Sequence, residues 1–201
     1  MRVLVLGGTG TLGRQIAKQA LDAGHTVRCM VRAPRKAAFL QEWGCELTRG
    51  NLLDAESLAY ALEDQEAVID AATARATDSE SVYRIDWDGK LNLYNQCRLK
   101  GVRRVVFTSL LEAERFRSVP LMDIKHCTEQ LLLESDFDVT ILRTCAFMQG
   151  VIGQFAIPVL ESQTVWVSGS STPIAYMNTQ DVARFAVAAL GREQTIGGSY
   201  P

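Results

Sequence analysis

A short apolar run, Val3 to Leu6, leads into a glycine-rich loop with GxxGxxG spacing that opens an amphipathic stretch. The loop consists of Gly7, Gly8, Thr9, Gly10, Thr11, Leu12 and Gly13. Glycines at a strand-to-helix turn let the backbone approach a pyrophosphate closely, and the helix start supplies unpaired N–H groups and a positive dipole. Because strand, turn and helix occur together, the spacing predicts a dinucleotide-binding loop. The alternative is a glycine-rich turn that serves packing only.

Cations follow a second β-branched run, Val27 to Val31, where a dinucleotide fold places the adenosine ribose. An acidic residue at this position would select NAD through the 2′-hydroxyl, but this chain has Arg32, followed by Arg35 and Lys36. Cationic donors of this kind favour a 2′-phosphate. The alternative is a set of solvated charges, although cations at a helix amino terminus are unfavourable without an anion. We therefore expect NADP(H) as the cofactor.

Short apolar and β-branched runs alternate with amphipathic stretches along most of the chain. The predicted strands are Val3–Leu6, Val27–Val31, Cys45–Thr48, Ala67–Asp70, Arg104–Thr108 and Val139–Leu142. The predicted helices are Leu12–Ala23, Arg35–Trp43, Ala55–Leu62, Ser81–Leu99 and Met122–Glu134. This alternation predicts an α/β fold, a doubly wound parallel sheet with helices on both faces. The length of 201 residues fits one such Rossmann domain over residues 1–201.

The regular pattern ends after Arg143, and we expect residues 144–178 to form an irregular insertion on the substrate or partner side of the domain. No charged residue occurs from Thr144 to Leu160, yet the stretch is too short and too broken by glycine and proline to span a membrane. Three arrangements remain open: a buried connection on the sheet, a surface facing membrane-embedded partners, or a surface covered by a carboxy-terminal segment.

The end of the chain carries weaker signals. Strand-like runs occur at Thr164–Val167 and Pro173–Met177, and a helical pattern follows at Thr179–Leu190. No further strand pattern is evident after this helix. We therefore expect the carboxy-terminal part of the fold to be incomplete and to lack its last strand.

Composition argues against several other functions. Lys and Arg total 21 against 23 Asp and Glu, so the chain lacks the positive charge typical of nucleic-acid binding. Its five cysteines show no CxxC spacing, and two histidines offer little for a metal site or a Ser–His–Asp relay. The first apolar run is shorter than a signal-peptide core. We expect no nucleic-acid partner, no metal site and a reducing, cytoplasmic environment.

Several motifs resemble those of the NmrA-like atypical short-chain dehydrogenase/reductase family. They are Gly7-Gly8-Thr9-Gly10, Arg32 before Pro34, Ala71-Ala72-Thr73 and Ile141-Leu142-Arg143. Other stretches resemble a narrower group, the photosystem II assembly factors of cyanobacteria and plastids. These stretches are Arg35–Leu40, Ile69–Arg75, Phe147–Gly150 and Thr172–Met177. Members of this group are longer than this chain.

The resemblance implies an NADP-binding-type scaffold rather than a typical enzyme. Such a protein would lie peripherally on the cytoplasmic or stromal face of the thylakoid membrane. Its partners would be photosystem II reaction-centre proteins and small, high-light-inducible chlorophyll-binding proteins. Composition and spacing alone do not indicate these partners.

One departure from enzymatic relatives bears on activity. Those relatives carry a Tyr-x-x-x-Lys pair after the fifth strand, whereas here Lys125 is retained and Leu121 stands at the tyrosine position. Loss of the phenol removes a proton donor worth roughly 10²- to 10⁴-fold in rate. We therefore assign no catalytic residue to the expected scaffold. The alternative function is an NADPH-dependent reductase in which Lys125 is the acid or base and Ser109 orients the substrate. A redox sensor without membrane partners is a third.

Family position also implies further contacts to the cofactor. Asn51 stands where relatives often carry Asp near the adenine, and Ala72 and Thr73 follow the fourth strand. Ser109 and Lys125 would lie at the nicotinamide ribose, with Phe147 near the nicotinamide. The alternatives are a strand-end cap for Ser109, an exposed helix charge for Lys125 and a core aromatic for Phe147.

Overall fold

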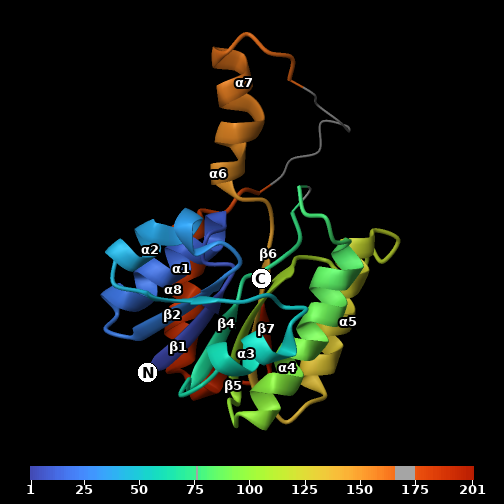
Figure 1. Ribbon diagram of the computed structural model, residues 1–201. Helices are drawn as coiled ribbons and strands as arrows, with labels where there is room; N and C mark the ends of the chain where they lie inside the picture. Colours follow the sequence, from blue (N-terminus) through green and yellow to red (C-terminus); the bar gives the residue numbers. More distant parts are fainter. Residues whose placement is uncertain (76, 166–174) are drawn as a thin grey trace.

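The computed structural model describes residues 1–75, 77–165 and 175–201. Its centre is a parallel sheet in the order β3-β2-β1-β4-β5-β6-β7 (Figure 1). The strands are β1 Arg2–Leu6, β2 Thr26–Val31, β3 Glu46–Arg49, β4 Ala67–Asp70, β5 Arg104–Leu110, β6 Asp138–Thr144 and β7 Gly198–Tyr200. Every neighbouring pair is parallel. The prediction of a doubly wound α/β sheet is confirmed.

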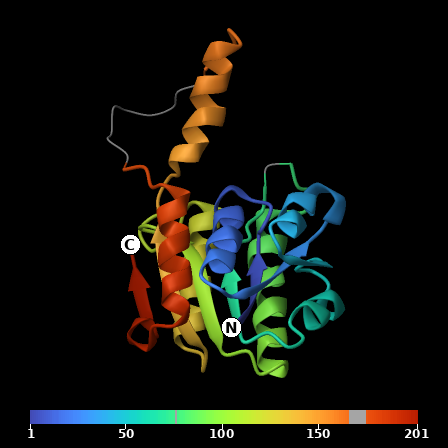
Figure 2. The ribbon, with the colours of Figure 1, turned by 90° about the vertical axis from the view of Figure 1, so that its left-hand side faces the viewer.

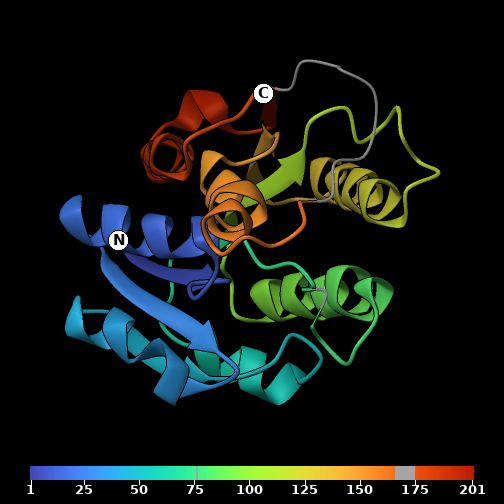
Figure 3. The ribbon, with the colours of Figure 1, turned by 90° about the horizontal axis from the view of Figure 1, so that it is seen from above.

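Helices cover both faces of this sheet. On one face lie α1 Thr11–Asp22, the short pair η1 Pro34–Ala37 and α2 Ala38–Glu42, and α8 Thr179–Leu190. On the other lie α3 Ala55–Ala61, the π turn η2 Arg84–Asp88 with α4 Gly89–Leu99, and α5 Pro120–Leu133. Figure 3, seen from above, shows α1 and α8 side by side. A short 3₁₀ turn, η4 Glu193–Thr195, precedes β7.

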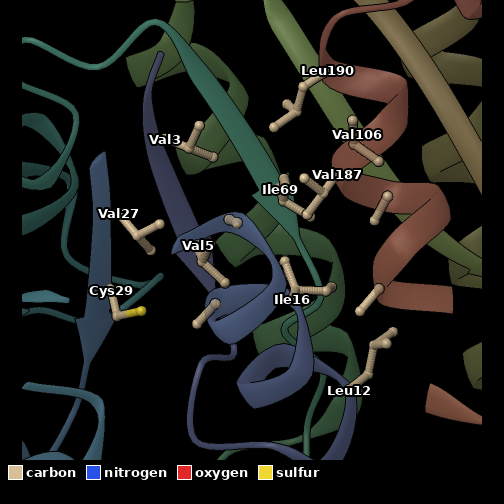
Figure 4. Close-up of a cluster of buried hydrophobic side chains, with 14 of the residues drawn as sticks. Val3, Val5, Leu12, Ile16, Val27, Cys29, Ile69, Val106, Val187 and Leu190 are labelled. Carbon is tan, nitrogen blue, oxygen red and sulfur yellow. The ribbon is translucent and has the colours of Figure 1, made fainter. Parts of the chain in front are cut away.

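Strand β1 divides the core into two layers, because successive side chains of a strand point to opposite faces. Val3 and Val5 pack with α1 and α8 (Figure 4), whereas Leu4 and Leu6 pack on the α3 and α4 side. All four side chains are essentially inaccessible to solvent. A strand buried on both faces reads as a continuous apolar run, which explains why Val3–Leu6 was recognisable from sequence.

The sheet order reverses at β1, since the chain runs outward to β2 and β3 and then returns to β4 on the other side. The carboxyl ends of β1, β2 and β4 therefore border one crevice, where ligands of such folds bind. Helix α1 opens into this crevice with Gly10 as its N-cap, which has no side chain to cap the helix. By contrast, Asp54 caps α3 and Asn178 caps α8 with side-chain acceptors.

The uncharged stretch after β6 differs from one of its expected arrangements. Residues 148–160 form a continuous helical segment, composed of α6 Met148–Val151, the π turn η3 Ile152–Ala156 and α7 Ile157–Leu160. This segment, called the projecting segment below, extends away from the domain (Figures 1 and 2). The arrangement as a buried connection on the sheet is therefore wrong.

The sequence predicted no strand after the helix at residues 179–190, but the structure has one there. Strand β7 pairs with β6 through Gly198, Ser199 and Tyr200, although the sequence showed no strand pattern there. Residues 164 and 165 are not in a strand, and Met177 forms only an isolated bridge with Phe147. The rest of the two predicted strand-like runs, residues 166–167 and 173–174, lies outside the described residues. Among the described helices, none has both the length and the apolar character needed to cross a bilayer.

Candidate functional site

A cleft of about 640 Å³ lies at the carboxyl ends of the strands, at the reversal of the sheet order. Most of the site residues expected from sequence line it. They are Gly7, Thr9, Gly10, Thr11, Leu12, Gly13, Arg32, Asn51, Ala72, Thr73, Ser109 and Lys125. Phe147 also lines the cleft, near the base of the projecting segment. Gly8, Arg35 and Lys36 are outside this lining.

The glycine loop is shaped by contacts that leave no room for side chains. A Cβ on Gly7 would lie 2.5 Å from the Ala71 carbonyl oxygen, and Gly7 has a φ of +79°, which favours glycine. A Cβ on Gly13 would lie 2.5 Å from the Gly7 carbonyl carbon. Gly8 packs instead against Cys29 and Leu40, away from the cleft. The loop thus presents bare backbone at the start of α1.

Charged side chains gather around this loop. Arg14 donates to the carbonyl oxygens of Thr9 and Gly10 at 3.1 and 3.2 Å, and Arg75 donates to Thr9 Oγ1 at 3.1 Å. Arg32 forms an ion pair with Asp78 at 2.8 Å. Arg35 and Lys36 are exposed on η1 and do not line the cleft. Of the three cations expected at the adenosine ribose, Arg32 is therefore the one that lines the cleft.

The sequence pattern did not indicate Arg14, Arg75 and Asp78 as residues of this cleft. Arg14 directly follows Gly13, so its position next to the loop was a signal that could have been used. Arg75 and Asp78 lie in an irregular connection after β4, where no periodicity indicates which way a side chain points. Hydrogen bonding from Arg32, and then from the Arg75 backbone N–H, lowers the pKa of Asp78 below its usual value.

At the opposite end of the cleft, Lys125 lies beneath the end of β5. It is 5% exposed, donates to the Thr108 carbonyl oxygen at 2.9 Å and sits 4.7 Å from the Phe107 ring centroid. The interpretation of Lys125 as an exposed helix charge is therefore wrong. Burial, and next the nearby Lys90 charge, lower the pKa of Lys125 to about 8. A lysine of this kind can hold or release a proton near neutral pH.

Ser109 and Leu121 complete this end. Ser109 is 1% exposed, and its Oγ has no hydrogen-bond partner among the described residues. A buried hydroxyl without a partner is rare, and such an atom next to a cleft is available to a ligand. Leu121 lines the same cleft and contributes no proton donor. The arrangement can bind and orient a polar group, but it lacks the acidic hydroxyl that enzymatic relatives use.

A buried ionic cluster supports the floor of the cleft. Lys90 pairs with Asp70 Oδ1 and donates to the Ala72 carbonyl oxygen at 2.9 Å, while the Tyr94 hydroxyl donates to Asp70 Oδ2 at 2.9 Å. Asp86 Oδ2 accepts from the Ala74 backbone N–H at 2.8 Å. Burial and the Asp70 charge raise the pKa of Tyr94 well above its usual value. The cluster therefore fixes residues 70–74, which border the cleft.

Asn51 lies at the adenine side of the expected site. Its side-chain oxygen accepts from the Leu53 N–H at 3.1 Å, and its own backbone N–H donates to Ser57 Oγ at 3.1 Å. The side chain is exposed and lines the cleft beside Gly50 and Leu52. Asn51 thus shapes a turn at the cleft while keeping its amide group accessible.

Comparison with known proteins gives consistent matches along the chain. A model of a family described as NAD(P)H-binding matches residues 7–193. Photosystem II assembly factor Ycf39 of Synechocystis sp. is 57% identical over 201 residues, covering 100% of this chain and 62% of the relative. The protein of the same name from Cyanophora paradoxa is 48% identical, covering 100% and 63%. The expected resemblance is confirmed, and the chain spans less than two thirds of these relatives.

A solved structure supports the fold. The NADP(H) complex of Citrobacter sp. triphenylmethane reductase matches with a TM-score of 0.83 at 21% identity, covering 100% of this chain and 69% of that chain. At this identity the match shows a shared architecture and says nothing about a shared substrate.

Proposed function

Because this chain belongs to the NAD(P)H-binding family, we propose that it binds NADP(H) in the cleft and acts as a scaffold in photosystem II assembly. The observation that carries this proposal is the intact glycine cradle combined with Leu121 in place of a proton donor. The similarity to Ycf39 supports the assembly role. A catalytically silent or weakly active site fits such a scaffold.

The residues present fit a dinucleotide. The bare backbone of Gly7–Gly13 and the open start of α1 would hold the pyrophosphate, and Arg32 would hold the 2′-phosphate. Residues near the ends of β3 and β4, Asn51, Ala72 and Thr73, would border the adenosine. Ser109 and Lys125 would orient the nicotinamide ribose. Bound NADPH would supply a hydride if an acceptor entered the cleft. Arg35 and Lys36 lie outside the cleft, so the preference for NADP(H) rests on Arg32.

Replacing Arg32 with Asp is expected to abolish the preference for NADPH over NADH. Charge-assisted hydrogen bonds to the 2′-phosphate contribute about 1.5–3 kcal/mol, which corresponds to roughly tenfold to a hundredfold in affinity. Calorimetric titration with both nucleotides measures the change. Arg184→Asp is the matched control, because Arg184 pairs with Asp181 on the exposed side of α8. An Arg32→Asp variant that still prefers NADPH, or a parent protein that binds both equally, would remove the basis of the assignment.

The projecting segment is the surface that we propose for binding partner proteins. No charged residue occurs between Arg143 and Glu161, and Met148, Ile152 and Leu160 are exposed. An uncharged, apolar projection suits contact with membrane-embedded proteins better than contact with water. We assign this surface to photosystem II reaction-centre proteins and high-light-inducible chlorophyll-binding proteins. The protein would then lie peripherally on the cytoplasmic or stromal face of the thylakoid membrane.

Replacing Ile152 and Phe155 together with Asp is expected to reduce recovery of the protein with photosystem II assembly intermediates. The change puts two charges on the apolar surface and leaves the cleft untouched. Co-purification from membranes, quantified against the parent, measures the effect. Phe185→Asp controls for a new charge at an exposed aromatic elsewhere, on α8. Unchanged recovery of a folded, nucleotide-binding variant would show that the segment is not the docking surface.

The second candidate function, an NADPH-dependent reductase, rests on Lys125 and Ser109. Lys125 has a pKa lowered to about 8, and Ser109 Oγ has no partner among the described residues. Both groups would face the carbonyl of a substrate bound at the nicotinamide. The scaffold proposal predicts little or no oxidation of NADPH with quinones or enones.

The pH dependence separates the two functions. If Lys125 protonates a product, only its ammonium form is active, so turnover should fall as pH rises through about 8. NADPH oxidation followed by absorbance over pH 6–10, in the parent and in Lys125→Ala, gives the answer. Lys100→Ala is the control, since Lys100 is exposed at the end of α4. Brisk turnover that Lys125→Ala abolishes, with NADPH affinity retained, would replace the scaffold proposal with the reductase.

A further inference from the structure

Asp78 occupies a defined position at the cleft and is not explained by the glycine cradle. Its Oδ1 pairs with the Arg32 guanidinium at 2.8 Å, and its Oδ2 accepts from the Arg75 backbone N–H at 2.8 Å. The Asp78 side chain is 9% exposed, whereas that of Arg32 is 52% exposed. Both carboxylate oxygens are thus engaged, and Arg32 is the partner that remains open to solvent.

The topology makes this pair a bridge across the cleft. Arg32 follows β2, Asp78 belongs to the connection after β4, and β1 lies between these two strands. The same connection reaches the glycine loop, where Arg75 donates to Thr9 Oγ1 at 3.1 Å. Arg32, Arg75, Asp78 and Thr9 all line the cleft. The connection therefore contacts both the expected 2′-phosphate position and the expected pyrophosphate position.

We propose that Asp78 is a specificity-determining residue whose carboxylate competes with the ribose 2′-phosphate for Arg32, so that it weakens NADP(H) binding selectively. This inference rests on the proposed binding of NADP(H). A guanidinium satisfies a carboxylate and a phosphate through the same forked donors, so a bound 2′-phosphate must share or displace Asp78. A 2′-phosphate bound to Arg32 and the Asp78 carboxylate would share one cation, so the two anions would also repel each other.

The Asp78 carboxyl group, which would compete with the 2′-phosphate, is negatively charged at neutral pH. Hydrogen bonds from Arg32 and from the Arg75 backbone lower the pKa of Asp78, so its carboxyl is ionised at neutral pH. NAD(H) carries a hydroxyl where NADP(H) carries the phosphate. A carboxylate accepts a hydrogen bond from that hydroxyl and does not repel it. Asp78 therefore reduces the difference in binding affinity between NADP(H) and NAD(H) that Arg32 creates.

Asp78→Asn tests the inference, because the amide keeps the shape and removes the charge. NADPH affinity, measured by calorimetric titration of the same chain, is expected to rise about threefold to tenfold, within the range for partly exposed charged hydrogen bonds. NADH affinity is expected to stay the same or fall. Asp181→Asn is the matched control, since Asp181 forms an exposed ion pair with Arg184 and does not line the cleft. Thermal unfolding of each variant confirms that it is folded.

A double variant tests whether the gain in NADPH affinity depends on Arg32. In an Arg32→Ala background, Asp78→Asn should no longer raise NADPH affinity beyond a small gain from reduced repulsion. Unchanged or weaker NADPH binding in a folded Asp78→Asn variant of a protein that binds NADPH would overturn this inference alone, and weaker binding would mean that Asp78 orients Arg32. A parent protein that binds neither nucleotide would overturn the proposed function and this inference with it.

Discussion

Replacing Lys90 with Met is expected to lower the free energy of unfolding by about 3–5 kcal/mol, the range for breaking a buried ion pair from one side. Lys90 and Asp70 are 1% and 0% exposed, so the carboxylate left behind has no access to water. It would keep two donors, the Tyr94 hydroxyl at 2.9 Å and the Ala72 backbone N–H at 3.2 Å, and lose its only described cation within bonding distance. Urea unfolding of parent and variant measures the difference.

Two further variants show whether the buried charge is the cause. Lys18→Met removes a helical lysine from an exposed ion pair with Asp22, and it should cost less than about 1 kcal/mol. Asp70→Asn added to Lys90→Met removes the stranded charge and should recover about 1 kcal/mol or more. A Lys90→Met variant as stable as Lys18→Met would contradict the interpretation. Retained nucleotide affinity in a folded Lys90→Met variant would show that the cluster serves stability and not the cleft.

The sequence predicted those parts of the site that depend on local order. The glycine loop follows a strand and opens a helix, so its place at the cleft could be predicted from spacing within residues 3–13, while its role in binding a dinucleotide stays a prediction. Arg32 was recognised for the same reason, because the end of β2 is defined by an apolar run. The alternation of strands and helices was sufficient to predict a parallel sheet with two covered faces.

The remaining contacts depend on the sheet order. Lys90 and Tyr94 lie 20 and 24 residues after Asp70, and they meet it only because α4 packs against the sheet at β4. Arg32 and Asp78 meet across β1 for a similar reason. Buried lysines are rare, so the residue type alone predicts an exposed position for Lys90 and Lys125. Strand β7 is short and begins with glycine, which explains why no periodic pattern indicated it.

Replacing Gly13 with Ala is expected to weaken NADPH binding by roughly fivefold to a hundredfold. A Cβ at this position would overlap the Gly7 carbonyl and lie 3.0 Å from the Gly8 nitrogen, both of which are backbone atoms. Backbone cannot rotate away as a flexible side chain can, so either α1 or the loop must shift. Such overpacking costs about 1–3 kcal/mol, which sets the expected loss in affinity if the strain falls on the loop.

The control for this change is Gly153→Ala in the projecting segment, where a Cβ would meet no atom within 4 Å. That variant should bind NADPH like the parent and be at least as stable, because alanine favours helix over glycine by roughly 0.5–1 kcal/mol. Calorimetric titration and thermal unfolding of both variants separate loss of binding from loss of folding. If Gly13→Ala stays folded and binds NADPH as tightly as the parent, the pyrophosphate does not lie on this loop. Gly13 would then serve the close packing of α1 against β1 and β4, and NADPH would bind in a pose that does not depend on this glycine.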